Sequence, residues 1–133
     1  MIINLTQHAA SIEQVASGVR DVPADMRDRL TAALTFGAAP STRDILTRAA
    51  SLAQIALEAA HALGGTCDDA MIGGAPYLMA PLERALEEVM VQALYSFSVR
   101  ESVEQAQPDG SVRKIAVFRH VGWVEAAEEY EEA

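Results

Sequence analysis

The chain has 133 residues, of which half are hydrophobic and 22% are charged, and its formal net charge is −9. These values are typical of one globular domain with a core of its own. The acidic balance argues against binding of duplex nucleic acid through a basic surface, and no apolar run reaches the roughly 18 residues of a membrane helix.

The first third of the chain predicts a strand followed by helices. The opening stretch MIINLT reads as a short buried strand, because it begins with β-branched and apolar residues. No basic region precedes it, so we expect no signal peptide and a cytoplasmic protein. Ser11 and Gln14 have capping-box spacing, which predicts a short helix that ends before Pro23. Residues 24–35 read as a second helix.

A long third helix is expected over residues 41–63. Ser41, with Asp44 three residues later, opens it, and many alanines line its apolar stripe. Such small side chains favour close approach to a sheet or to another helix. The single cysteine that follows, Cys67, cannot form an internal disulfide, which suits a reducing compartment and a structural role.

Residues 69–72 read as a second short strand that runs into the segment MIGGAPYLMA, residues 71–80. A helix should follow and continue to about Met90. Pro81 falls within that helix, although proline lacks the N–H group and clashes with the preceding turn. Either residues 76–80 form a separate loose turn, or the helix is kinked there.

In the last third of the chain, apolar and polar residues alternate with a period of two, which is typical of strands. YSFSVRESVEQ predicts a half-buried strand, Pro108-Asp109-Gly110 a tight turn, and VRKIAVFRHVGWV the returning strand. The register expected for this hairpin has three diagnostic pairs: Glu104 opposite Lys114, Ser98 opposite His120, and Tyr95 opposite Trp123. An acidic tail, residues 125–133, follows.

The element order predicts an α/β fold, a small Rossmann-like sheet with helical layers and a C-terminal β-hairpin, in one domain over residues 1–124. Sheets of this kind bind ligands at the carboxyl ends of their strands. Three segments meet that condition: Thr6-Gln7-His8, Gly73-Gly74-Ala75-Pro76, and residues 98–102.

The glycine segment has two interpretations. It can be a plain corner between a strand and a helix, or its backbone N–H groups can surround an anion at the start of that helix. His8 can act as a general acid, a general base or a hydrogen bonder, or it can be an ordinary surface residue. Arg100, with Ser98 on the same side of the strand, can hold a phosphate or form a salt bridge. One cysteine and three scattered histidines do not make a metal site, and no cofactor is expected.

Two stretches, NLTQHAASIEQVASGV and MIGGAPYLMAPLERA, resemble motifs of small CRISPR-associated ring nucleases of type III systems, which are Rossmann-like and CARF-related. The chain is also similar to proteins of phage and bacterial genomes. The resemblance implies a homodimer that binds a cyclic oligoadenylate across its two-fold axis. In such families a ribose 2′-hydroxyl attacks the adjacent phosphorus without a metal. The positions that match these motifs are Thr6, Gln7, His8, Gly73, Gly74 and Pro76.

Three functions follow as hypotheses. The first is a ring nuclease with His8 and Arg100 as catalytic residues, acting in or against antiviral signalling. The second is a protein of the same fold that sequesters a cyclic nucleotide without cutting it. The third is an interaction domain that uses the alanine-rich helix as its interface.

Overall fold

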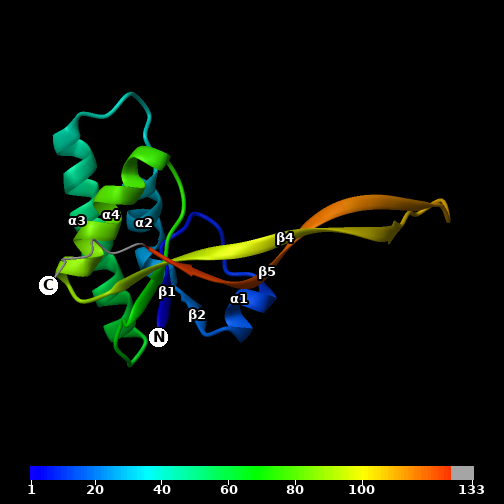
Figure 1. The fold of residues 1–133 in the computed structure, drawn as a ribbon, viewed down its shortest axis with the longest axis horizontal. Coiled ribbons are helices and arrows are strands. Elements are labelled where there is room, and N and C mark those ends of the chain that lie inside the picture. Colours follow the sequence, from blue (N-terminus) through cyan, green and yellow to red (C-terminus); the bar gives the residue numbers. More distant parts are fainter. Residues whose placement is uncertain (127–133) are drawn as a thin grey trace, which may run out of the picture.

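A five-stranded sheet in the order β2-β1-β3-β4-β5 organises the computed structural model, which describes residues 1–126 (Figure 1). The first four strands are parallel, and β5 runs antiparallel to β4. This arrangement confirms the expected small Rossmann-like α/β fold. The elements are β1 (Ile2–Asn4), α1 (Ile12–Ala16), β2 (Val19–Asp21), η1 (Ala24–Met26), α2 (Arg27–Leu34), α3 (Thr42–Ala62), β3 (Asp69–Met71), α4 (Pro76–Glu88), β4 (Gln92–Ala106) and β5 (Val112–Glu125).

The strand β2 was not expected from the sequence. It has only three residues, Val-Arg-Asp, between Gly18 and Pro23, and so short a segment shows no readable alternation. It pairs with β1, Ile2 opposite Val19, and completes a parallel crossover through α1. The capping box at Ser11 and Gln14 that starts α1 is confirmed.

The helices α2, α3 and α4 lie together on one side of the sheet, and α1 lies near the base of the long hairpin (Figure 1). The main core forms between the three clustered helices and the sheet, and it includes Ile3, Leu52, Ile55, Leu78 and Leu82. By contrast, α1 has no buried residue. No helix of the described residues is long and apolar enough to cross a membrane.

The alanine stripe of α3 is part of this core. Ala49, Ala53, Ala56, Ala59 and Ala60 are all buried within the chain. Their small side chains let α3 approach its neighbours closely, as the sequence predicted, but the stripe leaves no free surface for a partner. The expected use of this helix as an interface is therefore not supported by its packing.

The helix α4 runs through Pro81 without a break, so residues 76–80 are its first turns and not a separate turn. It ends where Val91 N–H donates to the Leu86 carbonyl and Met90 N–H donates to the Glu87 carbonyl. Met90 takes a positive φ of 64° in this motif, at a position that glycine usually occupies.

The strands β4 and β5 continue far beyond their neighbours as a two-stranded hairpin that projects from the domain (Figure 1). Gly110 has a φ of 86°, and its N–H donates to the Gln107 carbonyl, as expected for the Pro-Asp-Gly turn. The pairs Glu104–Lys114 and Ser98–His120 are confirmed.

The third pair expected for the hairpin was wrong. Tyr95 lies opposite Val124, and Trp123 lies opposite Ser96. An irregularity between Phe97 and Ser98 shifts the register by one residue, and bulges of this kind are not visible in an alternating pattern. The final strand also extends to Glu125, the first residue of the expected acidic tail, and residues 127–133 lie outside the described chain.

Candidate functional site

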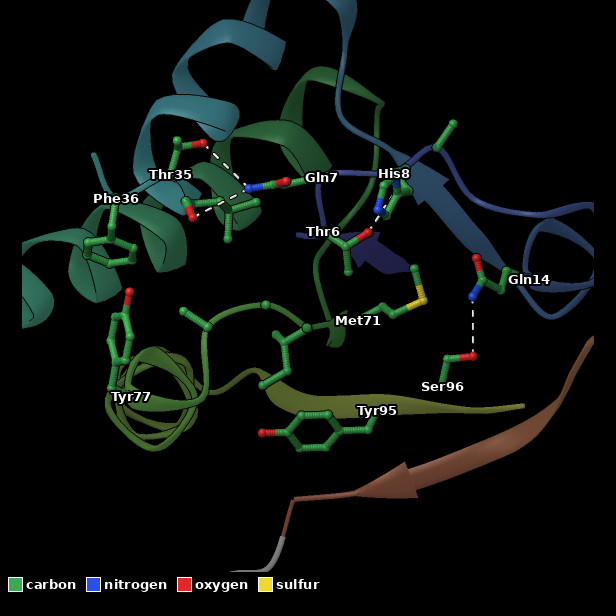
Figure 2. A pocket seen from close by; sticks show the side chains of 16 residues that line it. Thr6, Gln7, His8, Gln14, Thr35, Phe36, Met71, Tyr77, Tyr95 and Ser96 are labelled. Atoms are coloured by element: carbon green, nitrogen blue, oxygen red, sulfur yellow. Dashed lines mark hydrogen bonds between the residues drawn. The ribbon is translucent and has the colours of Figure 1, made fainter. Parts of the chain in front are cut away.

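A cavity of about 780 Å³ opens at the carboxyl ends of β1 and β3, beside Tyr95 and Ser96 in the first half of β4 (Figure 2). The loop after β1 and the glycine loop after β3 form two of its sides. The end of α2 and the first turn of α4 add aromatic side chains, and Tyr95 and Ser96 of β4 complete the lining. The cavity thus lies at the edge of the sheet where α/β proteins bind their ligands.

Asn4 holds the loop after β1 in place. Its side chain is buried, with 2% exposed, and its amide nitrogen donates to the His8 carbonyl and to Asp21 Oδ1, both at 2.8 Å. Its amide oxygen accepts from the backbone N–H of Thr6 at 2.9 Å and from the Thr6 hydroxyl at 2.7 Å. These four bonds fix the backbone from Thr6 to His8. The His8 imidazole itself is exposed at the cavity and has no hydrogen-bond partner among the described residues.

The glycine loop presents unused backbone donors beside the cavity. Within the described residues, no hydrogen bond uses the N–H groups of Gly73, Gly74, Ala75 or Tyr77. Gly74 has a φ of 138°, a conformation that other residues rarely adopt. Ala75 precedes α4, whose first helical residue is Pro76, and no side chain caps this end. The positive end of the helix dipole therefore faces the cavity region without a bound side chain.

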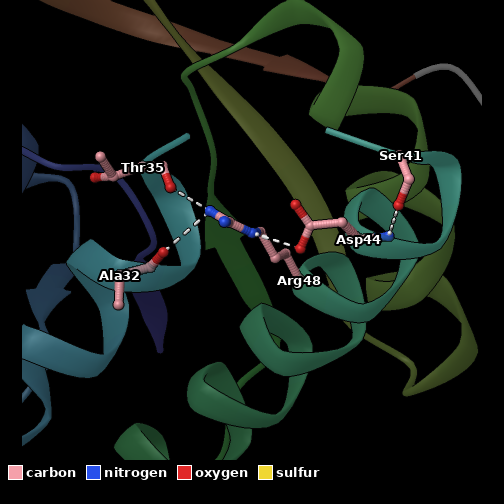
Figure 3. Close-up of polar contacts among 5 residues, drawn as sticks. All are labelled: Ala32, Thr35, Ser41, Asp44 and Arg48. Atoms are coloured by element: carbon pink, nitrogen blue, oxygen red, sulfur yellow. Dashed lines mark hydrogen bonds and ion pairs between the residues drawn. The ribbon is translucent and has the colours of Figure 1, made fainter. Parts of the chain in front are cut away.

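Two aromatic rings meet on one side of the cavity. The rings of Phe36 and Tyr77 pack edge to face with their centroids 5.2 Å apart. Arg48 of α3 lies over the Phe36 ring at 4.2 Å, and its guanidinium donates to the carbonyls of Ala32 and Thr35 at the end of α2 (Figure 3). Asp44 accepts from Arg48 Nε at 3.0 Å. Arg48 therefore stabilises the end of α2 and orients Phe36.

The wall made by β4 has two polar networks. The Tyr95 hydroxyl donates to Glu83 Oε2 at 3.2 Å, and burial together with the Glu83 carboxylate raises the pKa of Tyr95 to about 12. Ser96 Oγ lies 2.6 Å from His120 Nδ1 and accepts from Gln14 Nε2 at 3.2 Å. The His120 ring is buried and packs against Trp123 with centroids 4.4 Å apart. Ser96 is therefore fixed between α1 and β5.

Six of the residues predicted for the site line this one cavity: Thr6, Gln7, His8, Gly73, Gly74 and Ala75. Pro76 is not in the lining, but it directly follows Ala75 as the first residue of α4. The structure thus brings together the two loops that the sequence singled out.

Ser98 and Arg100 lie apart from this cavity, on the projecting hairpin. The strand β3 ends at Met71, which pairs with Leu94, so the crevice is beside Tyr95 and Ser96 and not beside residues 98–102. Ser98 Oγ is 3.4 Å from Ser96 Oγ. Arg100 is exposed and lies opposite Phe118. The position of Arg100 therefore gives no support to a catalytic role within this cavity.

Most of the residues that line the cavity were not predicted from the sequence. Sequence reasoning did not select Gln14, Phe36, Tyr77, Tyr95 or Ser96, each of which lines the cavity. It also missed the support from Asn4, although a polar residue within an otherwise apolar strand was a usable signal. Tyr77 lies within the segment MIGGAPYLMA, directly after the proline that starts α4, and this position was a second signal.

The lining is largely uncharged. Among the described residues, it contains no lysine, arginine, aspartate or glutamate, and His8 is its one histidine. Within residues 1–126, which the structure describes, no group of three or more His, Cys, Asp or Glu is arranged to hold a metal ion. The groups available for chemistry are therefore backbone donors, hydroxyls, amides, His8 and aromatic faces.

Comparison with known proteins identifies a family. Residues 1–124 match the model described as "Uncharacterized protein MJ1673 family". The chain belongs to this MJ1673 family. The match includes the cavity and nearly all of the projecting hairpin, so both features lie within the MJ1673 region of the chain. No curated protein and no solved structure matches the chain.

Proposed function

We propose that the cavity binds a cyclic oligoadenylate and that the protein is a metal-independent ring nuclease of the cytoplasm, in or against type III CRISPR signalling. One observation carries the proposal. A single cavity at the carboxyl ends of parallel strands combines unused N–H groups, a histidine and aromatic rings. These are donors for a phosphate, a group for proton transfer and surfaces for a base.

The expected roles follow from these groups. The N–H groups of the glycine loop and of Tyr77 would donate to a phosphate next to the start of α4. The rings of Tyr77 and Phe36 offer apolar surface for an adenine base. A volume of about 780 Å³ lies in the usual range for small-molecule sites.

The proposed reaction depends mainly on holding the attacking 2′-oxygen in line with the bond that breaks. The 2′-oxygen of one ribose would form a bond to the adjacent phosphorus, and the bond from that phosphorus to the 5′-oxygen of the next nucleotide would break. The 2′-hydroxyl gives up a proton and the leaving 5′-oxygen gains one. The first cut opens the ring to one linear molecule, with a 2′,3′-cyclic phosphate at one end and a 5′-hydroxyl at the other. His8 would transfer one of these protons.

Binding without cleavage is the second candidate function, and a specific observation favours it. No cationic side chain lines the cavity among the described residues. Enzymes that cut phosphodiesters commonly place donors or cations where negative charge develops in the transition state. A cavity whose donors include no lysine or arginine suits the ground state of a phosphate at least as well.

Turnover of a labelled panel of cyclic oligoadenylates tests both candidates. A ring nuclease converts one ring size to linear products with a 2′,3′-cyclic phosphate in the presence of EDTA. His8→Ala should then bind as before and cut about 10²–10⁴-fold more slowly. His61→Ala is the matched control, because His61 is an exposed histidine in the last turn of α3, outside the lining.

Tight binding without products would leave sequestration as the function. If the wild-type protein neither binds nor cuts any member of the panel, both candidates are wrong. If His8→Ala cuts at the rate of the wild type, the proton-transfer role of His8 is wrong even if the activity is real.

A further inference from the structure

The hairpin arm, residues 98–120, is a two-stranded ribbon that projects from the domain, and no other element of the described residues covers it (Figure 1). Phe118 is 74% exposed and Val99 is 41% exposed on its two faces. Within the described residues, the arm's one ion pair to another element joins Arg119 to Glu13 of α1, near its base. A two-stranded hairpin alone is at best marginally stable in water, so pairing with a partner would stabilise the arm.

Within the described residues, the edge of β4 that pairs with β3 at the base has no partner strand along the arm. At the base, Gln92 N–H donates to the Asp68 carbonyl and the Leu94 carbonyl accepts from Ile72 N–H, so even-numbered residues direct their backbone groups to this edge. At the tip, Gln107 N–H donates to the Ser111 carbonyl, so odd-numbered residues bond to β5. The backbone groups of five residues therefore face an unpaired edge: Ser98, Arg100, Ser102, Glu104 and Ala106.

The side chains along this edge are self-complementary. Arg100 and Glu104 lie on the same face of β4, four residues apart, and no salt bridge within the described residues uses either of them. We propose that two copies of the chain dimerise through this edge, antiparallel, with the two-fold axis at Ser102. That register pairs the even-numbered residues with one another and sets Arg100 of each copy opposite Glu104 of the other. The two arms then form one four-stranded sheet.

Other symmetric registers lose this match. Centring the axis on Arg100 or on Glu104 places like charges opposite each other, which is destabilising. A one-residue shift of the axis leaves Arg100 and Glu104 opposite uncharged residues. Among registers that pair even-numbered residues along the arm, only the axis at Ser102 joins opposite charges.

The outer edge of β5 is a poor alternative. The charged residues of this strand within the arm are Arg113, Lys114 and Arg119, all of them basic. Two copies paired through β5 would bring these cations together with no acid between them. Pairing β4 of one copy with β5 of the next would leave open edges and form a chain of molecules instead of a closed dimer.

The same register bears on the cavity, and this step rests on the proposed function. With the axis at Ser102, Pro108 of the partner subunit falls opposite Ser96, which lines the cavity. The turn of one arm would thus border the partner's ligand site. The axis itself is six residues from Ser96 along β4, or about 20 Å. Each copy would then bind its own ligand, unlike the dimer that the resemblance implies, in which one ligand lies across the axis.

Site-directed crosslinking tests the interface without any ligand. In a Cys67→Ala background, Ser102→Cys should be joined efficiently to its symmetry mate by a short bis-maleimide, because paired Cα atoms are about 5.5 Å apart. Ala106→Cys is the matched control on the same face. Its symmetry mate would be about 27 Å away, so it should not be joined. Capture of Ala106→Cys but not of Ser102→Cys overturns the register.

Charge reversal tests the pairing independently. Arg100→Glu should weaken the dimer in sedimentation equilibrium by at least about tenfold in Kd, since it sets acid against acid twice. Arg100→Glu with Glu104→Arg should restore much of the affinity. Arg113→Glu, the same change on the basic strand, should leave the dimer intact. A monomer at every concentration, or a dimer indifferent to Arg100→Glu, overturns the proposal.

Ligand stoichiometry separates the two proposals. One cyclic ligand per chain supports separate cavities, and one per two chains contradicts the axis at Ser102. A dimer that passes the crosslinking test but binds no cyclic nucleotide would support the interface and count only against the proposed function.

Discussion

At the scale of single residues, Asn4 supports the site from beneath the loop after β1. It is buried and makes four hydrogen bonds to the loop that carries His8 and to Asp21. Asn4→Ala should lower the free energy of unfolding by about 2–3 kcal/mol, because it leaves buried partners unsatisfied. Urea denaturation measures this loss. Gln54→Ala on the exposed side of α3 is the control and should change stability little. If Asn4→Ala has the same free energy of unfolding as the wild type, the hydrogen bonds of Asn4 do not stabilise the loop after β1.

Tyr95 gives a prediction about pH. Its pKa is raised from 10.0 to about 12 by burial and by the Glu83 carboxylate. Because the native state keeps this proton longer than the unfolded chain, the stability from Tyr95 is complete below pH 10 and is lost as the pH rises toward 12.

Spectrophotometric titration of the tyrosines should show one phenol that ionises near pH 12. Tyr95→Phe should remove that step and flatten the alkaline fall in stability. If Tyr95→Phe instead removes a step at the ordinary pKa of tyrosine, the hydroxyl is not held by Glu83 in solution.

How much of the site could be predicted from the sequence depends on the kind of residue. His8 and the glycines were found because they follow apolar strands directly, and strand ends meet at one edge of a parallel sheet. Arg48 and Phe36 were not found, because their contact joins α3 to the end of α2 across a loop. No local pattern records such a contact. Arg100 was selected for its charge and strand, but the length of β4 past β3 takes it away from the cavity.

At the scale of elements, the glycine loop allows a test that does not disturb the fold. A Cβ built on Gly73 would meet Thr6 Cγ2 at 3.6 Å, an ordinary contact, whereas any side chain at Gly74 is strained by its φ of 138°. Gly73→Ala should therefore fold normally and reduce affinity for the proposed ligand by about tenfold or more, since the methyl group would stand where the phosphate is proposed to approach.

Thermal unfolding and ligand titration should be measured on the same Gly73→Ala sample. Gly122→Ala is the control, because a Cβ there meets nothing within 4 Å and Gly122 does not line the cavity. Unchanged affinity in Gly73→Ala would mean that the loop is only a corner between β3 and α4.

The elements themselves were predicted unevenly, for physical reasons. Long amphipathic helices and the turn at Gly110 carry strong local signals, and both were found. The strand β2 was missed because three residues are too few to show an alternating pattern. Its pairing with β1 depends on tertiary structure, which no local pattern in the sequence shows. The register error at Tyr95 has a similar origin, since a bulge adds one residue without changing the alternation on either side.

At the scale of the whole molecule, the domain and the hairpin arm differ in how they are stabilised. The domain has a core between α2, α3, α4 and the sheet. The arm has cross-strand pairs, but no layer of the described residues packs on either of its faces, and its exposed apolar residues include Phe118 and Val112. If the arm is paired in a dimer, its stability depends on protein concentration, whereas that of the domain core does not.

Amide hydrogen exchange resolves this difference residue by residue. In a monomer, the N–H groups of Val99, Glu101 and Val103 bond to β5, while those of Arg100, Ser102 and Glu104 face water. In the proposed dimer both sets are bonded. Exchange followed by NMR should therefore show protection of Arg100, Ser102 and Glu104 that rises with protein concentration and disappears in Arg100→Glu. If these three amides exchange fast at every concentration while the β5-bonded amides stay protected, the edge of β4 remains unpaired in solution and the proposed dimer is wrong.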